Sequence, residues 1–192
     1  MELTQNPSVL ELVRKTAELT TPKEIVWIDG SEAQLESLRK IAVETGELIK
    51  LNEEKLPGCY LNRSDVNDVA RVEGRTFICS RTREEAGPTN NWMDPDEMKA
   101  KLHEILRCAM AGRTMYVIPY SMGVIGSPFA KYGIEVTDSI YVVLNMAIMT
   151  RIGTKVLEAL GDSDDVILGV HSKVTLDPEN RYIVHFPEEN KI

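Results

Sequence analysis

The sequence has little cysteine, and no two cysteines stand at a spacing typical of a metal site. Its 192 residues include three of them, Cys59, Cys79 and Cys108, at wide and unrelated spacings. The lack of a CxxC pair argues against a disulfide framework and against a zinc site built from cysteine. Because free cysteine is usually buried, we expect three reduced thiols, most of them buried, in a cytoplasmic protein.

Clusters of basic residues and long apolar runs are also missing. The net charge is −8, with 22 Lys and Arg against 30 Asp and Glu, so we expect no nucleic-acid partner, which would require clustered positive charge. The most apolar segment, IYVVLNMAIM (140–149), is about half the length of a membrane span and predicts a buried helix. The N-terminal residues lack a basic stretch followed by an apolar core, so we expect neither a signal peptide nor membrane attachment.

Helix-start signals and short apolar runs alternate along the chain. Asn6-Pro7 and Asp94-Pro95 each place proline directly after an N-cap residue, and Asp138 is expected to cap the helix that follows it. The predicted helices span 7–20, 31–46, 95–111, 139–151 and 154–160. The predicted strands span 24–28, 75–80, 114–119, 133–139, 165–170 and 181–186. This alternation indicates one layered domain, α/β or α+β, over residues 1–192.

The stretch GRTMYVIPYSMGVIGSP (112–128) has the outline of a strand that leads into a phosphate-binding loop. Its apolar run is expected to end at Pro119 and to open into a loop with two glycines. A P-loop needs lysine and then serine or threonine after its last glycine, and a dinucleotide fingerprint needs GxGxxG. Here Ser127 and Pro128 follow Gly126, so the stretch meets neither pattern.

Local metal and catalytic motifs are likewise missing from the sequence. The three histidines, His103, His171 and His185, lie far apart along the chain, whereas local zinc sites place them three to five residues apart. No HExxH, GxSxG or EF-hand pattern occurs. We therefore expect structural or solvent-exposed roles for these histidines.

The segment NDVARVEGRT (67–76) holds the strongest candidate site residues. Arg71 and Glu73 come just before the predicted strand at 75–80, beside a polar loop. In one interpretation the planar guanidinium of Arg71 binds a substrate carboxylate or phosphate, and Glu73 orients it. In the other, which the residues alone favour, the two side chains belong to an ion pair at the edge of a strand.

Several longer stretches resemble one family of enzymes. The block GRTMYVIPYSMGVIGSPFAKYGIEVTDSIYVVLNMAIMTRIG (112–153) closely resembles the corresponding part of GTP-dependent phosphoenolpyruvate carboxykinases. LPGCYLNRSDVNDVARVE (56–73), DVARVEGRT (68–76), NNWMDPDEM (90–98) and HSKVTLDPENRYIVHFPEENKI (171–192) also look like that family's N-terminal region. The resemblance covers nearly the whole chain in order. Val124 and Ile140 depart from it, since proline is expected at both positions.

This resemblance implies an enzyme that converts oxaloacetate and GTP reversibly to phosphoenolpyruvate, carbon dioxide and GDP, in gluconeogenesis or anaplerosis. It implies a mixed β-sheet flanked by helices, as in the N-terminal domain of that fold. Arg71, the arginine of the ARVE motif, would contact the carboxylate substrate, with possible support from Glu73. The 112–153 block would be scaffold, with its glycines shaping a turn.

The family's other functional parts lie beyond the region that this chain resembles. By resemblance these are the P-loop, the ligands of the divalent metal (manganese or magnesium), the guanine pocket and the mobile lid. We therefore expect no catalytic, cofactor-binding or metal-binding residues in these 192 residues, and no turnover by the chain alone. The implied partners are oxaloacetate or phosphoenolpyruvate and a C-terminal nucleotide-binding domain, and we expect a monomer. The alternative is a stand-alone, non-catalytic binding or assembly module derived from the same domain.

Overall fold

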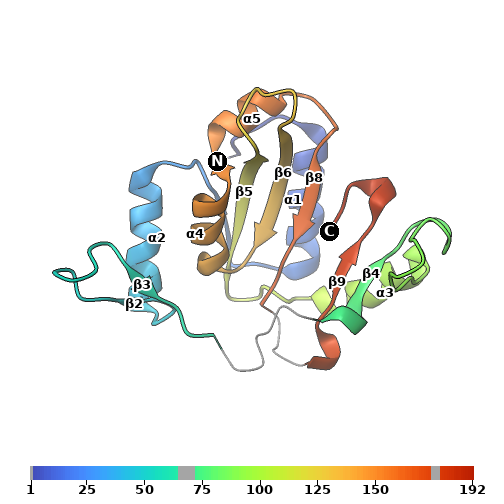
Figure 1. Ribbon diagram of the computed structural model, residues 1–192, viewed down its shortest axis with the longest axis horizontal. Coiled ribbons are helices and arrows are strands. Elements are labelled where there is room, and N and C mark those ends of the chain that lie inside the picture. Colours follow the sequence, from blue (N-terminus) through green and yellow to red (C-terminus); the bar gives the residue numbers. More distant parts are fainter. Residues whose placement is uncertain (1, 65–71, 174–177) are drawn as a thin grey trace.

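The computed structural model describes residues 2–64, 72–173 and 178–192 (Figure 1). Its α-helices are α1 (Pro7–Thr20), α2 (Glu32–Glu44), α3 (Pro95–Leu106), α4 (Ile140–Met149) and α5 (Thr154–Leu160). Its strands are β1 (Glu24–Trp27), β2 (Ile49–Lys50), β3 (Tyr60–Leu61), β4 (Thr76–Ile78), β5 (Thr114–Met122), β6 (Lys131–Thr137), β7 (Arg151–Ile152), β8 (Ile167–Val170) and β9 (Ile183–His185). Short 3₁₀ helices are η1 (Glu73–Arg75), η2 (Pro178–Asn180) and η3 (Pro187–Glu189).

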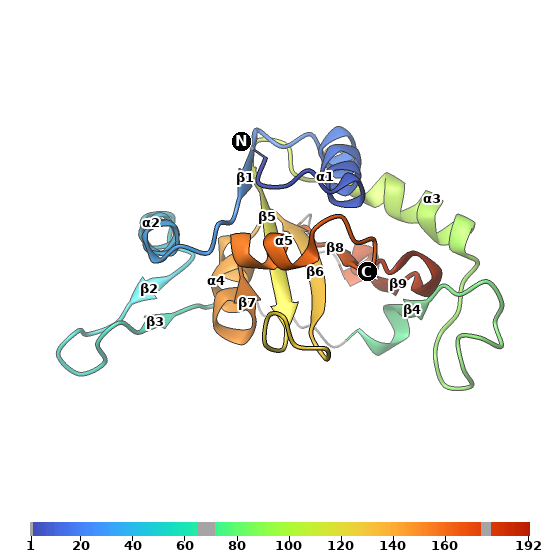
Figure 2. The same ribbon diagram turned by 90° about the horizontal axis from the view of Figure 1, so that it is seen from above.

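The main sheet is mixed, with the strand order β1-β5-β6-β8 and β7 paired to β5. β1 runs parallel to β5, and β8 runs parallel to β6. β5 and β6 form an antiparallel hairpin from Tyr116↔Thr137 to Met122↔Lys131, and β7 is antiparallel to β5. Helices flank this sheet (Figure 2), so the predicted α/β class is confirmed.

Side chains that alternate along the central strands pack into two separate hydrophobic cores, one on each face of the sheet. On one face Ile134 and Val136 pack with α1 and α5. On the other face Tyr116 and Ile118 of β5 pack with α2 and α4. The alternation follows from the period of two along a strand, and Figure 1 shows α1 behind the sheet and α4 in front of β5.

A smaller unit beside the main sheet pairs β4 with β9 in parallel, from Thr76↔Ile183 to Ile78↔His185. α3 covers it, with Met98 fully buried beside Val184 and Phe186. This unit brings two stretches of the chain together that are more than a hundred residues apart. It fixes the positions at which the chain enters η1 and leaves η2.

The caps predicted for the first helices are present. The Asn6 side chain accepts a hydrogen bond from Val9 N, and Ser31 does so from Gln34 N. The Gln34 amide, however, bonds back to Asp29 N and Trp27 O. It therefore ties the start of α2 to the end of β1, while Ser31 N, its partner in a capping box, donates to Asp29 Oδ1 instead.

β5 passes through Pro119, where the sequence predicted the strand to end. Pro119 pairs with Ile134, and β5 continues to Met122. The ring nitrogen falls on the side of β5 that faces the gap between β1 and β7, where the Pro119 carbonyl accepts from Gly153 N at 2.9 Å. Because no partner on that side requires an N–H at this position, proline is tolerated inside the sheet.

Two burial expectations were wrong. Cys79 is buried, but Cys59 and Cys108 are exposed free thiols. α4 is buried on one side only, because Ile148 and Met149 are 82% and 69% exposed. Within the described ranges, no helix combines the length and the hydropathy that a bilayer crossing requires.

Candidate functional site

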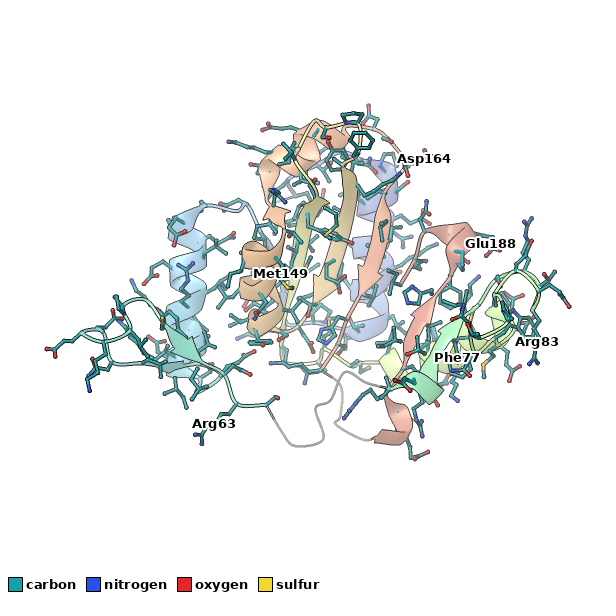
Figure 3. All side chains as sticks on the ribbon, in the orientation of Figure 1. Arg63, Phe77, Arg83, Met149, Asp164 and Glu188 are labelled. Atoms are coloured by element: carbon teal, nitrogen blue, oxygen red, sulfur yellow. The ribbon has the colours of Figure 1, made fainter. Side chains whose placement is uncertain are left out.

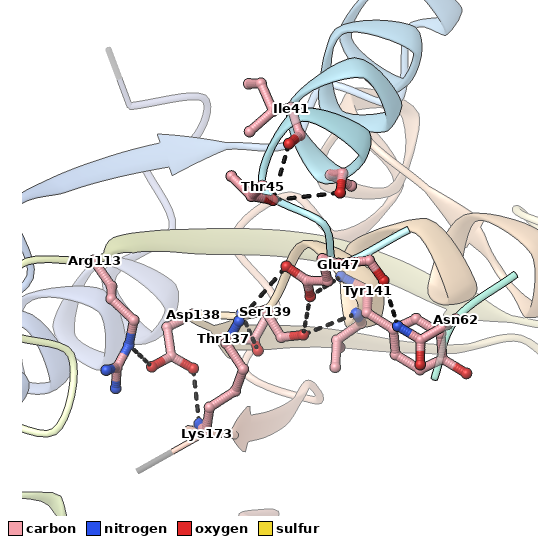
Figure 4. A network of polar contacts seen from close by, with 12 residues as sticks. Ile41, Thr45, Glu47, Asn62, Arg113, Thr137, Asp138, Ser139, Tyr141 and Lys173 are labelled. Atoms are coloured by element: carbon pink, nitrogen blue, oxygen red, sulfur yellow. Dashed lines mark hydrogen bonds and ion pairs between the residues drawn. The ribbon is translucent and has the colours of Figure 1, made fainter. Parts of the chain in front are cut away.

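A buried carboxylate lies at the carboxyl end of β6, just before α4. The Asp138 side chain is 0% exposed and pairs with Arg113, with 2.7 Å between Oδ2 and Nε (Figure 4). Ser172 Oγ donates to the same oxygen at 3.2 Å, and Lys173 N donates to Oδ1 at 2.9 Å. A charge removed from water needs such compensation. We call Arg113, Asp138, Ser172 and Lys173 the Asp138 cluster.

The expectation that Asp138 caps α4 was wrong. Ser139 is the N-cap, and its hydroxyl accepts from Val142 N at 3.4 Å. Asp138 points away from the helix, toward Arg113 and the segment at 172–173. A sequence pattern cannot distinguish two adjacent capping residues when one has an ion-pair partner 25 positions away.

A second carboxylate, Glu47, joins the start of α4 to the loop after α2. Glu47 Oε1 accepts from Ser139 Oγ at 3.3 Å and from Tyr141 N at 3.1 Å (Figure 4). Negative charge at a helix N-terminus is favourable. Glu47 Oε2 lies 3.6 Å from Lys173 Nζ, and the Glu47 carbonyl accepts from Asn62 Nδ2 at 2.7 Å.

Both carboxylates hold Lys173, and the backbone carbonyl of Glu47 holds Asn62. Asn62 precedes the first undescribed stretch, 65–71, and Lys173 immediately precedes the second, 174–177. Arg63, exposed, lies at the same end of the molecule (Figure 3). Asn62, Arg63, Val72 and Lys173 contribute to one groove of about 1410 Å³. The groove therefore brings together the ends of segments that are about a hundred residues apart in the sequence.

Of the two predicted substrate residues, Arg71 lies outside the described residues. Glu73 is the exposed first residue of η1, and its carbonyl accepts from Asn91 Nδ2 at 2.7 Å. Arg75 pairs with Glu179 at 2.7 Å, and its guanidinium lies 5.5 Å from the centre of the Tyr182 ring. Arg75 thus ties η1 to η2, whereas Glu73 presents its carboxylate to solvent.

Sequence reasoning missed the residues that hold this site together. Asp138 and Arg113 are 25 positions apart, and Glu47 and Ser139 are 92 apart, so no local motif links them. The Thr137 hydroxyl and His171 Nδ1, 2.8 Å apart, join β6 to the residue after β8 in the same way. Such pairs could be found from a sequence only once the strand order was known.

The site offers charged and polar groups that position segments, and it lacks the parts of a metal centre. Within residues 2–64, 72–173 and 178–192, no three His, Cys, Asp or Glu side chains are arranged to hold a metal ion. What the described residues do supply is one wall of a groove whose lining includes Val72, the residue that follows Arg71 in the sequence.

Comparison with known proteins gives the family. Residues 11–192 match the model of the phosphoenolpyruvate carboxykinase N-terminal domain. The chain belongs to this family. A phosphoenolpyruvate carboxykinase (GTP) of Anaeromyxobacter dehalogenans is 52% identical over 189 residues, 98% of this chain and 32% of the relative. Enzymes of the same name from Neocallimastix frontalis and Corynebacterium jeikeium are 48% and 46% identical, over 97% and 98% of this chain and 33% of each relative.

The chain thus spans about a third of the length of the curated relatives that it matches. The residues matched to the carboxykinase N-terminal domain include Arg71, Glu73, the buried Asp138 and Glu47, which lines the groove. The resemblance found in the sequence is therefore confirmed at the level of the family.

Proposed function

We propose that this chain is the substrate-side, N-terminal domain of a GTP-dependent phosphoenolpyruvate carboxykinase. The complete enzyme would convert oxaloacetate and GTP to phosphoenolpyruvate, carbon dioxide and GDP, reversibly, in gluconeogenesis or anaplerosis. The observation that carries the proposal is 52% identity over 98% of this chain to a relative that bears this name. Free cysteines are compatible with a reducing compartment, and we extend the proposal to a cytoplasmic monomer.

Within this domain, Arg71 would bind the carboxylate of oxaloacetate or phosphoenolpyruvate. A guanidinium presents donors in a rigid fork that matches a carboxylate with two parallel hydrogen bonds. Positive charge is needed locally because the net charge of the chain is −8, which repels a dianion. Glu73, two residues on and exposed, would orient Arg71 without occupying the position of the substrate.

GTP and the divalent metal, manganese or magnesium, would be held by the rest of the enzyme. The described residues do not fit either group, since they bring together no metal-ligand set and the sequence holds no P-loop. The contribution of this chain is therefore to bind and orient the small dianion and to form one wall of the cleft. For the same reason we expect no turnover by the isolated chain.

A domain-exchange experiment tests the proposal. Residues 1–192 would replace the matching third of the Anaeromyxobacter dehalogenans enzyme, and GTP-dependent formation of phosphoenolpyruvate from oxaloacetate would be measured. We expect activity from the chimera and none from the purified 192-residue chain. A folded chimera without activity, or turnover by the isolated chain that survives repurification, would contradict the proposal.

A further inference from the structure

Among the described residues, helices cover one half of the main sheet on only one of its two faces. Behind β6 and β8, α1 packs on Ile134 and Val136. In front of β5, α4 packs on Ile118. No described helix lies in front of β6 and β8, as both orientations show (Figures 1 and 2). We call the residues that point forward here, Gly133, Glu135 and Gly169, together with Tyr120 of β5, the front face.

Two side chains lie flat on this face because glycine stands beneath each of them. Tyr120 pairs with Gly133, and a Cβ added to Gly133 would collide with the Tyr120 ring. Glu135 pairs with Gly169, and a Cβ added to Gly169 would collide with the Glu135 carboxylate. The face is therefore shallow, and another polypeptide can approach it closely.

The Glu135 carboxylate has no hydrogen-bond donor or cation from the described residues, although it is only partly exposed. Burial raises its pKa to about 7. Tyr120 is the titratable neighbour from β5, and its own pKa is raised by burial first and then by the charge of Glu135. Directly after β8, His171 Nδ1 lies 2.8 Å from the Thr137 hydroxyl and is engaged there. The Glu135 oxygens are not among the fully buried unpaired atoms, so water still reaches them, and a polypeptide that displaced this water would have to supply a donor or a cation.

The edge of the sheet beside this face already carries a further segment. Leu168 N donates to Asn190 O at 2.8 Å, Ile192 N to Leu168 O at 2.9 Å and Val170 N to Ile192 O at 3.0 Å. Residues 190–192 thus lie along β8 in a parallel direction. In the relatives, about two thirds of the polypeptide lies outside the region matched by this chain.

We propose that the front face is the docking surface for that remaining part of a carboxykinase polypeptide, which supplies a cation or hydrogen-bond donor to Glu135. This inference rests on the proposed function. A second copy of this chain fits less well, because two apposed front faces would bring two Glu135 carboxylates together. The donor would be a lysine, an arginine or an amide group, since these complement a carboxylate.

The test compares Glu135→Gln in the isolated chain and in the chimera with the Anaeromyxobacter dehalogenans enzyme. In the isolated chain at pH 8, the neutral amide removes an unpaired charge, so the Tm should rise by several degrees. In the chimera the same substitution weakens the contact with the docked part, so the Tm should fall. Glu158→Gln, an exposed position on α5, is the matched control and should shift neither Tm. A change of the same sign in both proteins would overturn the inference.

Binding between separate polypeptides gives a second measurement in case the chimera does not fold. The relative's remaining two thirds would be titrated into the 192-residue chain near pH 7. We expect proton release on binding, seen as a heat that depends on the buffer, and at least about tenfold weaker binding by Glu135→Gln, equal to about 1.4 kcal/mol. No binding, equal binding by the variant, or self-association of the chain through this face would overturn the inference. Activity of the chimera is measured separately from its Tm. A chimera that is inactive, but whose Tm falls with Glu135→Gln while the Tm of the isolated chain rises, would contradict only the proposed function.

Discussion

Asp138 and Arg113 form an ion pair in which one partner is completely buried and the other is 37% exposed. The pair connects the turn before β5 to the end of β6, and Asp138 also receives the backbone N–H of Lys173. The position of the chain beside the groove therefore depends on a carboxylate that water cannot stabilise.

Replacing Arg113 should destabilise the fold more than replacing an exposed arginine. Arg113→Met leaves Asp138 buried without its cation, and we expect a loss of about 3 kcal/mol in the free energy of unfolding, the low end for a broken buried pair. Urea denaturation measures this loss in unfolding free energy. The control is Arg81→Met, because Arg81 is 74% exposed in its pairs with Glu85 and Glu188, and a surface pair contributes under about 1 kcal/mol. Equal losses in the two variants would contradict a structural role for the buried pair.

Glu135 should make the isolated chain less stable as the pH rises through the neutral range. Burial raises the pKa of Glu135 to about 7 in the native chain, above the ordinary value of 4.5. Above 4.5 the unfolded chain releases this proton while the native chain keeps it, so stability falls between about pH 4.5 and 7 and then stays level. The shift corresponds to roughly 3 kcal/mol. The measurement is the difference in unfolding free energy between Glu135→Gln and the unchanged chain from pH 4 to 8. A difference in unfolding free energy that stays constant from pH 4 to 8 would contradict the raised pKa of Glu135.

The exposed thiols give a rapid check on the fold. In the native chain, Cys59 and Cys108 should react at once with a thiol reagent such as DTNB, because both are exposed. Cys79 should react only after unfolding, since it is 1% exposed and burial raises its pKa. The Cys79→Ala variant should lose the slow phase and keep both rapid equivalents. Three rapid equivalents in the unchanged native chain would contradict the burial of Cys79.

Local signals in the sequence predicted the elements well and their partners poorly. Asn6 and Ser31 mark helix starts because a cap acts within three residues. The pairing of β4 with β9 and the Asp138–Arg113 contact depend on segments that meet only after folding. The end of β5 was wrongly predicted at Pro119 for the same reason, because tolerance of proline in a strand depends on which neighbouring strand faces it. The prediction that Arg71 binds the substrate came from family resemblance, because a single arginine before a strand has no chemical signature of its own.

Gly153 should tolerate substitution least among the glycines, because the backbone of another segment lies directly against it. Its φ is +104°, and an added Cβ would collide with the backbone carbonyl of Asp29, which cannot move as a side chain can. Gly153→Ala should therefore lower the unfolding free energy by more than about 2 kcal/mol. Gly74→Ala is the control, because its φ is not positive and no atom lies within 4 Å of the added Cβ. It should change stability by less than about 0.5 kcal/mol. Thermal unfolding of both variants measures the contrast, and similar losses would contradict the close approach of Gly153 and Asp29.

Arg71 should prove to be a substrate residue in an active chimera. We expect Arg71→Ala to lower kcat/KM for oxaloacetate at least about a hundredfold, or about 3 kcal/mol of transition-state stabilisation, because the dianion loses its charged partner. Arg71→Lys should recover little, since an ammonium cannot supply two parallel hydrogen bonds. Arg63→Ala removes an exposed positive charge eight residues earlier in the sequence, so this control distinguishes the loss of a specific contact from a change in local charge. If Arg63→Ala and Arg71→Ala lower kcat/KM equally, or if Arg71→Ala lowers it less than about threefold, electrostatic attraction and not a carboxylate contact explains the role of this segment.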